Sequence, residues 1–239
     1  MLTKATMSTP ENHLIALLPR KDRARFLAAC EHVDLPLEQT LSEPGKPTKY
    51  VYFPTEGFIS LIAVVEGSPG VEVGMVGSEG MLGVQMALGV VTAPLHALVQ
   101  GEGKAWRIGT QAFKAQLAAS PALQSELHRY LYVLMSQLAE SAACVRFHQI
   151  GPRLARWLLM SQDRSHADTF DVTQEFLAYM LGVRRVGITT AAGDLQRSGV
   201  ISYSRGKLTV LDRTGLENAS CSCYKTDQKT YARMLDNKF

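Results

Sequence analysis

The sequence is poor in cysteine, and its four cysteines do not form a framework. Cys30, Cys144, Cys221 and Cys223 are too few and too scattered along 239 residues for the disulfide scaffold of a small secreted domain. Cys221 and Cys223 have the spacing of two metal ligands, but a zinc site normally needs four ligands in two close pairs, and the sequence offers no second close pair. We therefore expect reduced thiols, no metal site and no cofactor.

The N-terminus lacks the apolar core of a signal peptide, which predicts a cytoplasmic protein. Residues 80–101 contain no charged side chain and are long enough in principle to span a bilayer. However, Gln85, Thr92, Pro94 and His96 interrupt the stretch, and neither flank is basic. We expect a buried segment of a soluble domain and no membrane partner.

Motifs of the common enzyme classes are also missing. The sequence has no nucleophile elbow, no P-loop and no paired histidine ligands of the metalloprotease type. The six histidines do not form a metal-ligand pattern. We therefore expect that the chain is not an enzyme.

Basic residues outnumber acidic residues mainly in the C-terminal part of the chain. From residue 151 to 239, 13 Lys and Arg stand against nine Asp and Glu, whereas the whole chain has a net charge of only +3. With 46% apolar and 20% charged residues, the composition is that of a globular protein. The excess positive charge lies where an anionic partner would be attracted.

Helical and strand patterns alternate along the first half. Residues 12–29 predict one or two short helices broken at Pro19. Short β-prone runs follow at residues 50–53, 58–65, 71–76, 95–99 and 104–108, separated by turns rich in glycine and proline. They predict a small antiparallel barrel or roll. Thr110 is then a plausible N-cap for a helix that runs toward Ser120.

A long helix is predicted from Pro121 to about His148. Apolar residues with the 4-3-4 spacing of a helix-pair seam are Leu123, Leu127, Tyr130 and Leu134. A flanking row seven residues apart consists of Leu131, Leu138 and Val145. One edge of this wide stripe can meet a second helix while the other lies on the roll. Burial of the stripe within its own protomer is the alternative, but the motif that follows favours dimerisation.

Residues 173–196 predict two short helices joined by a tight turn. Thr173 is a good N-cap, and Gly182 lies in the turn. At 100° per residue, the second helix gathers its apolar residues, Ile188, Ala191, Ala192 and Leu195, on one side. Such a hairpin can be a pure packing unit, but the opposite side is small and basic. The pattern is therefore typical of a helix-turn-helix.

Two β-prone runs, VISY and LTVL, follow this motif. Ser204-Arg205-Gly206-Lys207 joins them as a tight basic turn. We expect a wing whose Arg205 and Lys207 contact phosphates.

The segment TQEFLAYMLGVRRVGITTAAGDLQRSGVISYSRGKLTVLD resembles the winged helix-turn-helix of the Crp/Fnr regulators. The upstream segments YVYFPTEGFISLI and VGMVGSEGMLG are similar to that family's β-roll, and the resemblance covers about residues 12–220. It implies an α+β fold with an N-terminal, jelly-roll-like antiparallel β-roll, a long dimerisation helix and a C-terminal winged helix-turn-helix. The expected units are a sensor domain with N-terminal helices at 1–120, a dimerisation helix at 121–149 and a DNA-binding domain at 150–239.

The resemblance also implies which side chains meet DNA. Arg185 falls where the family usually has a base-reading arginine, which can bind guanine in a bidentate manner. The following position is often Glu, but Val186 stands here and offers only apolar contact. The expected DNA contacts are Arg184, Arg185, Val186, Thr189, Thr190, Arg205 and Lys207. The expected partners are double-stranded DNA, a second copy of the chain and RNA polymerase.

The cassette with which family members hold a cyclic nucleotide is absent. By that resemblance a Glu should follow Gly83 to hold the ribose, but Val84 stands there, and Leu95-His96 replaces the phosphate-binding Arg-Ser pair. A phosphate buried without a guanidinium is costly. The candidate residues of an effector pocket are Gly80, Gly83, Val84, Leu95 and His96. The effector is unknown, and a single N-terminal cysteine, Cys30, also argues against the family's iron–sulfur cluster.

An alternative function remains open from the sequence. The roll could be a ligand- or metal-binding module, either a cupin-like enzyme or a sensor, with a helix-turn-helix that binds protein. Arg185, Arg205 and Lys207 argue for DNA instead, because they place positive charge on the outward face.

Overall fold

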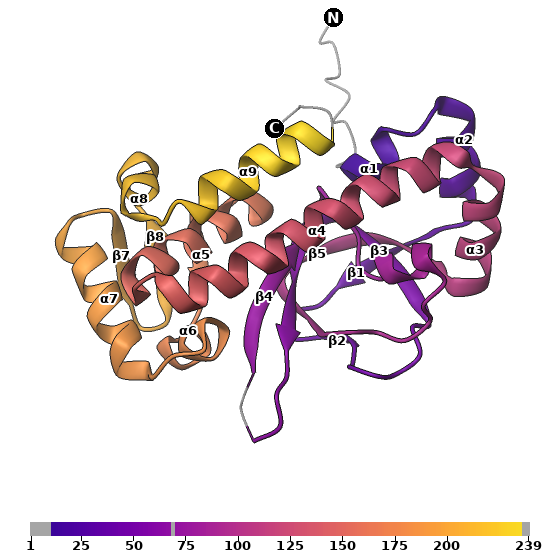
Figure 1. The fold of residues 1–239 in the computed structure, drawn as a ribbon. Coiled ribbons are helices and arrows are strands. Elements are labelled where there is room, and N and C mark those ends of the chain that lie inside the picture. The colour runs from indigo at the N-terminus through magenta and orange to yellow at the C-terminus, as the bar shows by residue number, and fades with distance from the viewer. Residues whose placement is uncertain (1–10, 68–69, 236–239) are drawn as a thin grey trace, which may run out of the picture.

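The computed structural model describes residues 11–67 and 70–235. An antiparallel sheet fills the N-terminal half, and helices with a small second sheet fill the C-terminal half. One long helix, α4 (Pro121–Phe147), runs along both halves (Figure 1). The α+β class and the predicted order of roll, long helix and helical C-terminal region are confirmed.

The N-terminal sheet has five strands: β1 (Glu31–Leu35), β2 (Thr40–Ser42), β3 (Tyr50–Ala63), β4 (Val71–Val76) and β5 (His96–Gly109). The strand order is β1-β5-β3-β4, and β2 also pairs with β5. The predicted runs 50–53 and 58–65 belong to one strand, as do 95–99 and 104–108. Register shifts around Glu56 and Phe58 let β3 and β5 continue through the predicted breaks.

The N-terminal helices are α1 (His13–Ala16) and α2 (Arg20–Ala28), separated at Pro19 as predicted. A 3-10 turn, η1 (Val84–Leu88), precedes β5, and α3 (Thr110–Ala119) follows it. The N-cap of α3 is Gly109, so the prediction that Thr110 caps this helix is wrong. Ser120 caps α4, because its hydroxyl accepts the Leu123 N–H at 3.1 Å.

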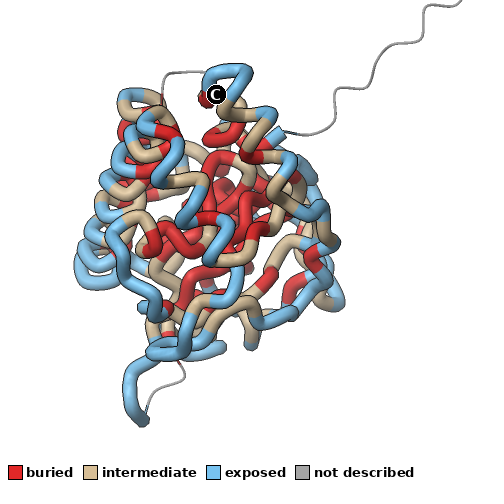
Figure 2. Tube along the Cα trace, turned by 90° about the vertical axis from the view of Figure 1, so that its right-hand side faces the viewer, coloured by how far each residue is buried: buried red, intermediate tan, exposed pale blue. Residues whose placement is uncertain are grey.

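The N-terminal half of α4 packs directly on the roll. Leu127 and Tyr130 are fully buried in a cluster with Val51 and Phe53 of β3. Gly80 permits this approach, because a Cβ at that position would overlap the Tyr130 hydroxyl. The sheet and the helix therefore share one buried core. Figure 2 shows the buried residues gathered in the interior of the fold.

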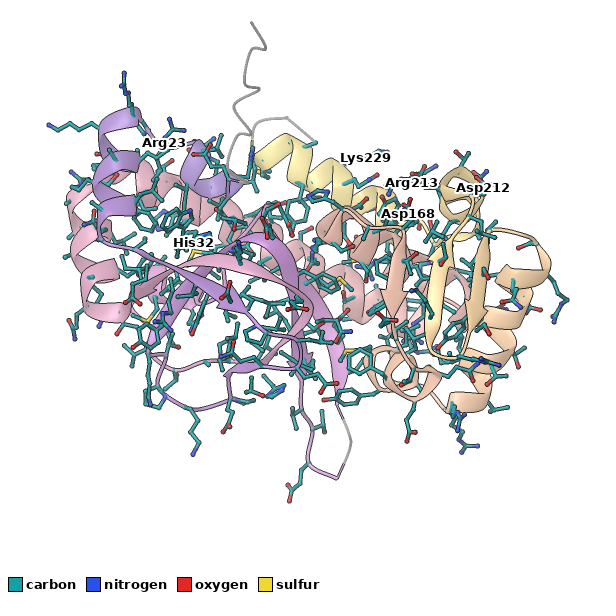
Figure 3. The ribbon with its side chains drawn as sticks, turned by 180° about the vertical axis from the view of Figure 1, so that it is seen from behind. Arg23, His32, Asp168, Asp212, Arg213 and Lys229 are labelled. Carbon is teal, nitrogen blue, oxygen red and sulfur yellow. The ribbon has the colours of Figure 1, made fainter. Side chains whose placement is uncertain are left out.

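The C-terminal half is built around α5 (Ile150–Ser165). Its other elements are β6 (Thr169–Asp171), α6 (Gln174–Leu181), α7 (Arg185–Arg197), β7 (Ile201–Ser204), β8 (Lys207–Val210) and α8 (Arg213–Ala219). The sheet order β6-β8-β7 includes a strand that the sequence did not predict. Arg213 of α8 (Figure 3) ties this helix to α5, because its guanidinium lies 2.7 Å from Asp163 and 2.8 Å from Gln162.

The last helix, α9 (Cys223–Met234), lies along α4 (Figure 1). Tyr231 and Leu235 join the core that α4 shares with the roll, and His13 Nε2 lies 2.8 Å from the Leu235 carbonyl oxygen. Within the expected DNA-binding unit, α9 thus packs on the long helix, and Leu235 contacts α1.

Two buried ion pairs fasten α5 to its neighbours. Arg164 and Glu79 lie 2.8 Å apart, and Glu79 belongs to the turn that follows β4 of the roll. Arg156 and Asp227 lie 2.6 Å apart and join α5 to α9. Burial disfavours the charge of Arg164, but the Glu79 carboxylate holds its pKa above the ordinary value.

Residues 80–101 form a loop, η1 and the start of β5. Among the helices that the structure describes, none is long and apolar enough to cross a bilayer.

Candidate nucleic-acid interface

The predicted helix-turn-helix is present in α6 and α7. Thr173 caps α6 by accepting the Phe176 N–H at 3.1 Å, and Gly182 ends α6 with a positive φ of 62°. α7 begins after Arg184, close to the predicted boundary. The residues predicted on its inner side are all buried: Ile188, Ala191, Ala192 and Leu195.

The opposite face of α7 is exposed and open. The expected contact residues on it are all exposed: Arg184, Arg185, Val186, Thr189 and Thr190. The exposed fraction of Val186 is 69%, which leaves this apolar side chain free to meet a partner. The start of α7 is also the positive end of its helix dipole, which favours an anion such as a phosphate.

A two-residue hairpin forms the wing beside this face. Arg205 and Gly206 connect the paired residues Ser204 and Lys207, and both have positive φ, 51° and 80°. This backbone matches the two-residue turns that favour Asn-Gly. An arginine in the left-handed region costs on the order of 1–2 kcal/mol, so Arg205 stands where Asn or Gly would be more stable. Arg205 and Lys207 are both exposed.

Hydrogen bonds fix the wing and the two helices to one another. The Tyr203 N–H donates to Gln196 Oε1 at 2.7 Å, and the Tyr203 hydroxyl donates to the Val172 carbonyl at 2.8 Å. Burial raises the pKa of Tyr203, and the nearby charge of Arg185 opposes the shift. The recognition surface is therefore held in one arrangement before any partner binds.

Gln174 is a further candidate contact that the sequence interpretation missed. Thr189 Oγ1 donates to Gln174 Oε1 at 2.7 Å, which places the Gln174 amide at the edge of the α7 face. Its position directly after the N-cap Thr173 was the available sign, because the first turn of α6 points toward the same surface.

A separate cavity of about 260 Å³ lies between the roll and α4. Of the residues expected in an effector pocket, Gly83, Val84 and Leu95 line this cavity, whereas Gly80 and His96 are not among its lining residues. Gly80 packs against Tyr130 instead, and His96 pairs with Ile62 as the first residue of β5. Leu131, Leu134, Met135 and Leu138 of α4 close the cavity, and no charged residue of the described chain lines it.

The structure corrects the expected dimerisation residues. Leu123, Leu127 and Tyr130 have exposed fractions of 2% or less within the single protomer, so they contact the roll and cannot meet a second helix. Leu134 is half-buried and packs on the same core. Rotation around α4 explains the error, because the 4-3-4 row faces the roll. The flanking row lies at the edge of that contact, with Leu131 and Leu138 half-buried and Val145 exposed.

Apolar side chains of the flanking row remain exposed on α4. Met135 is 60% exposed and Val145 is 45% exposed. With Leu131, Leu138 and Ala142 they repeat at 4-3-4-3 spacing. This spacing is the seam of a two-helix coiled coil.

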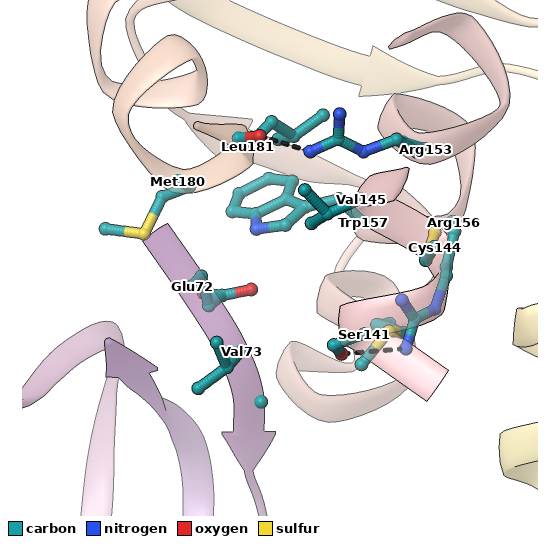
Figure 4. Close-up of a pocket in the computed structure, with 12 residues that line it drawn as sticks. Glu72, Val73, Ser141, Cys144, Val145, Arg153, Arg156, Trp157, Met180 and Leu181 are labelled. Carbon is teal, nitrogen blue, oxygen red and sulfur yellow. Dashed lines mark hydrogen bonds between the residues drawn. The ribbon is translucent and has the colours of Figure 1, made fainter. Parts of the chain in front are cut away.

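A small pocket lies among β4, α4, α5 and the end of α6 (Figure 4). Glu72 of β4 and Trp157 of α5 line it, and Arg153 donates to the Leu181 carbonyl at its rim. Burial raises the pKa of Glu72 to about 7. A larger cavity of about 600 Å³ lies beside α5 and α9, but the charged pair Arg164 and Glu79 in its wall is already matched.

Four side chains that can bind a metal ion converge where α4 ends. They are Cys144, His148, Cys221 and Cys223, and their ligand atoms all lie within 4.8 Å of one another. The hydrogen bond with Cys221 lowers the pKa of Cys144, whereas burial raises the pKa of Cys223 to about 12. The argument that no second ligand pair exists is wrong, because Cys144 near the end of α4 and His148, the C-cap residue of that helix, form such a pair.

Comparisons with known proteins agree with this architecture. Residues 152–219 match the family model of the Crp-like helix-turn-helix domain. FixK2 from Bradyrhizobium japonicum has a similar structure, with 12% identity and a TM-score of 0.66 over 81% of this chain and 98% of that chain. A Crp/Fnr-family regulator from Eubacterium rectale has 16% identity and a TM-score of 0.67 over 87% and 99% of the two chains.

The c-di-GMP-responsive regulator CLP of Xanthomonas campestris is also similar, with 18% identity and a TM-score of 0.66 over 81% of this chain and all of that chain, 100%. A search of the curated proteins finds no match to the sequence. At such identities the solved structures establish the fold alone.

Proposed function

We infer that the chain, which carries a Crp-like helix-turn-helix domain on the fold of the Crp/Fnr regulators, is a DNA-binding transcription regulator that reads a near-palindromic site as a homodimer. The observation that carries this proposal is the exposed, small and basic face of α7 beside the basic wing. Such a surface fits the major groove with α7 and the flanking phosphates with Arg205 and Lys207. A regulator of this kind would act in the cytoplasm, with RNA polymerase as a further partner.

The homodimer would form along the exposed row of α4. A second α4 can cover the exposed Met135 and the half-buried Leu131 and Leu138, which together leave an apolar strip partly open to water. Two recognition helices related by this axis would reach successive major grooves about 34 Å apart. The same residues line the cavity in the roll, so a ligand there would touch the dimer seam directly.

Replacing Arg185 by Ala should reduce both affinity and sequence discrimination. Loss of a bidentate guanine contact costs on the order of 1–3 kcal/mol, which corresponds to about 5- to 150-fold in affinity at one position of the site. Sites selected from random DNA would provide the probe, and competition binding would measure the discrimination.

Arg197→Ala is the matched control for Arg185→Ala. Arg197 lies at the other end of α7, is exposed and pairs with Asp194. Removing it takes one positive charge from the same helix without touching the expected base contact. Equal discrimination by Arg185→Ala and the parent protein would contradict the proposed register of α7 in the groove.

Replacing Arg205 by Asn should weaken binding to every sequence equally. Asn tolerates the left-handed turn, so the wing should keep its shape while one phosphate contact is lost. The slope of log affinity against log salt concentration should become shallower by about 0.9. A loss restricted to the selected site would show that Arg205 reads bases instead.

Cyclic AMP and cyclic GMP should not bind the roll cavity. A cyclic phosphate keeps its charge at neutral pH, and the cavity between Gly83 and α4 is lined by uncharged residues. An apolar effector fits this lining better, and regulation without a small ligand is the alternative. Isothermal titration with either nucleotide should show no saturable heat at micromolar concentrations. Saturable binding accompanied by tighter operator binding would contradict this expectation.

A further inference from the structure

The four potential metal ligands come from two segments that are far apart in the sequence. Cys144 and His148 stand one helical turn apart at the C-terminal end of α4, and the His148 N–H donates to the Cys144 carbonyl at 3.1 Å. Cys221 and Cys223 lie in the link between α8 and α9. This link reaches the end of α4 because α9 turns back along that helix.

The link is also fixed to α5. The Cys221 N–H donates to the Pro152 carbonyl at 3.3 Å, close to the start of α5. All three cysteines are buried, and His148 is half-buried. The ligand atoms are thus held by backbone contacts from three elements.

All four ligand atoms lie within 4.8 Å of one another, and two of the distances between them match those around one tetrahedral ion. With Zn–S bonds of about 2.3 Å and Zn–N bonds of about 2.0–2.1 Å, tetrahedral angles place two sulfurs about 3.8 Å apart and a sulfur and a nitrogen about 3.6 Å apart. The Cys144 and Cys221 sulfurs are 3.6 Å apart, and the Cys223 sulfur lies 3.5 Å from His148 Nδ1.

From these ligands we propose that Cys144, His148, Cys221 and Cys223 form a Zn²⁺ site of the Cys₃His type. Thiolate and imidazole ligands together favour zinc, and four protein ligands leave no open position for substrate, so the site is structural. The compact arrangement has room for a single ion, whereas an iron–sulfur cluster would place its own irons and sulfides between the cysteines. The site is independent of the effector cavity in the roll.

Zinc here would bind the end of the dimerisation helix to the link before α9. α5 begins only three residues after α4 ends, so the site lies at the joint between α4 and the DNA-binding domain. A bound ion would hold that domain at a fixed angle to α4. This consequence rests on the proposed function, whereas the metal site itself does not.

Metal content of the full-length protein tests the site directly. We expect about one zinc per chain by elemental analysis after loading and desalting. Replacement by Co²⁺ should give thiolate-to-metal charge transfer and the intense visible absorption of tetrahedral cobalt. Cys221→Ser should lower the affinity for zinc at least tenfold, measured by competition with a chromophoric chelator.

Cys30→Ser is the matched control, because Cys30 lies outside the cluster and should leave zinc binding unchanged. Far-ultraviolet circular dichroism shows whether each variant is folded. The zinc stoichiometry and the cobalt spectrum are measured on the unaltered chain, so these two tests do not depend on the folding of a variant. Absence of stoichiometric zinc and of the cobalt spectrum in the unaltered chain would overturn the proposal. A disulfide between Cys144 and Cys221 in protein purified under reducing conditions would also overturn the proposal. Mass spectrometry would detect it as the loss of two hydrogen atoms.

A DNA-binding measurement distinguishes the zinc site itself from its proposed effect on the DNA-binding domain. If the zinc-bound protein loses operator affinity on chelation while its dimer mass stays unchanged, the result supports the role of zinc in holding the DNA-binding domain at a fixed angle to α4. If zinc binds but the protein fails to bind any selected DNA, the proposed function fails while the metal site stands.

Discussion

Met135→Asp should convert the protein from a dimer to a monomer. Met135 is 60% exposed in the protomer, so a charge there leaves the protomer core intact but would be buried without a partner in an α4–α4 seam. The mass by light scattering should fall to that of one chain, 26.2 kDa. Operator affinity should fall by about 10²–10⁴-fold, because two linked recognition helices become one.

Ser125→Asp provides the matched control on the same helix. Ser125 is exposed and lies well to one side of the row formed by Leu131, Met135 and Leu138. The added charge should leave the dimer mass and the operator affinity unchanged. A dimer that persists in Met135→Asp would show that the subunits associate through another surface.

The helix-turn-helix was predictable because its signals are local. The Thr173 cap, the Gly182 turn and the inward residues of α7 are determined by spacing along a few turns of chain. The wing was predictable for the same reason, since a two-residue turn fixes the register of its strands.

Which face of α4 is buried against the roll was not predictable from residue spacing alone. Two apolar rows run along the helix, and only the approach of the roll decides which one is buried. Gly80 makes that approach possible through its contact with Tyr130, a contact 50 residues apart in sequence that the helical pattern does not contain.

The cluster of metal ligands depends on an even longer separation. Cys144 and Cys221 are 77 residues apart, and they meet only because α9 folds back along α4. Cysteine spacing indicated the pair Cys221 and Cys223. It did not indicate Cys144 and His148, which lie four residues apart in a segment that the sequence analysis assigned to the dimerisation helix.

The Glu79–Arg164 pair gives the glycine-rich turn after β4 a structural role. The side chains of Glu79 and Arg164 are only 6% and 8% exposed, and the Gly77 N–H also donates to Glu79 at 3.1 Å. Arg164 Nη1 donates to the Met160 carbonyl at 3.0 Å. The pair joins the roll to α5, so it connects the half that contains the cavity with the half that contains α7.

Arg164→Met should destabilise the protein by about 3–5 kcal/mol, because it leaves the Glu79 carboxylate buried without its cation. The double variant with Glu79→Gln should recover part of this loss, since no uncompensated charge remains. Urea unfolding at one protomer concentration measures both free energies of unfolding, and the fixed concentration keeps the contribution of dimerisation constant.

Arg23→Met is the control. Arg23 (Figure 3) pairs with Glu11 at the surface, and the exposed fractions of the two side chains are 36% and 45%. Loss of this pair should cost less than about 1 kcal/mol. Equal losses for Arg164→Met and Arg23→Met would show that the buried pair does not fasten the roll to α5.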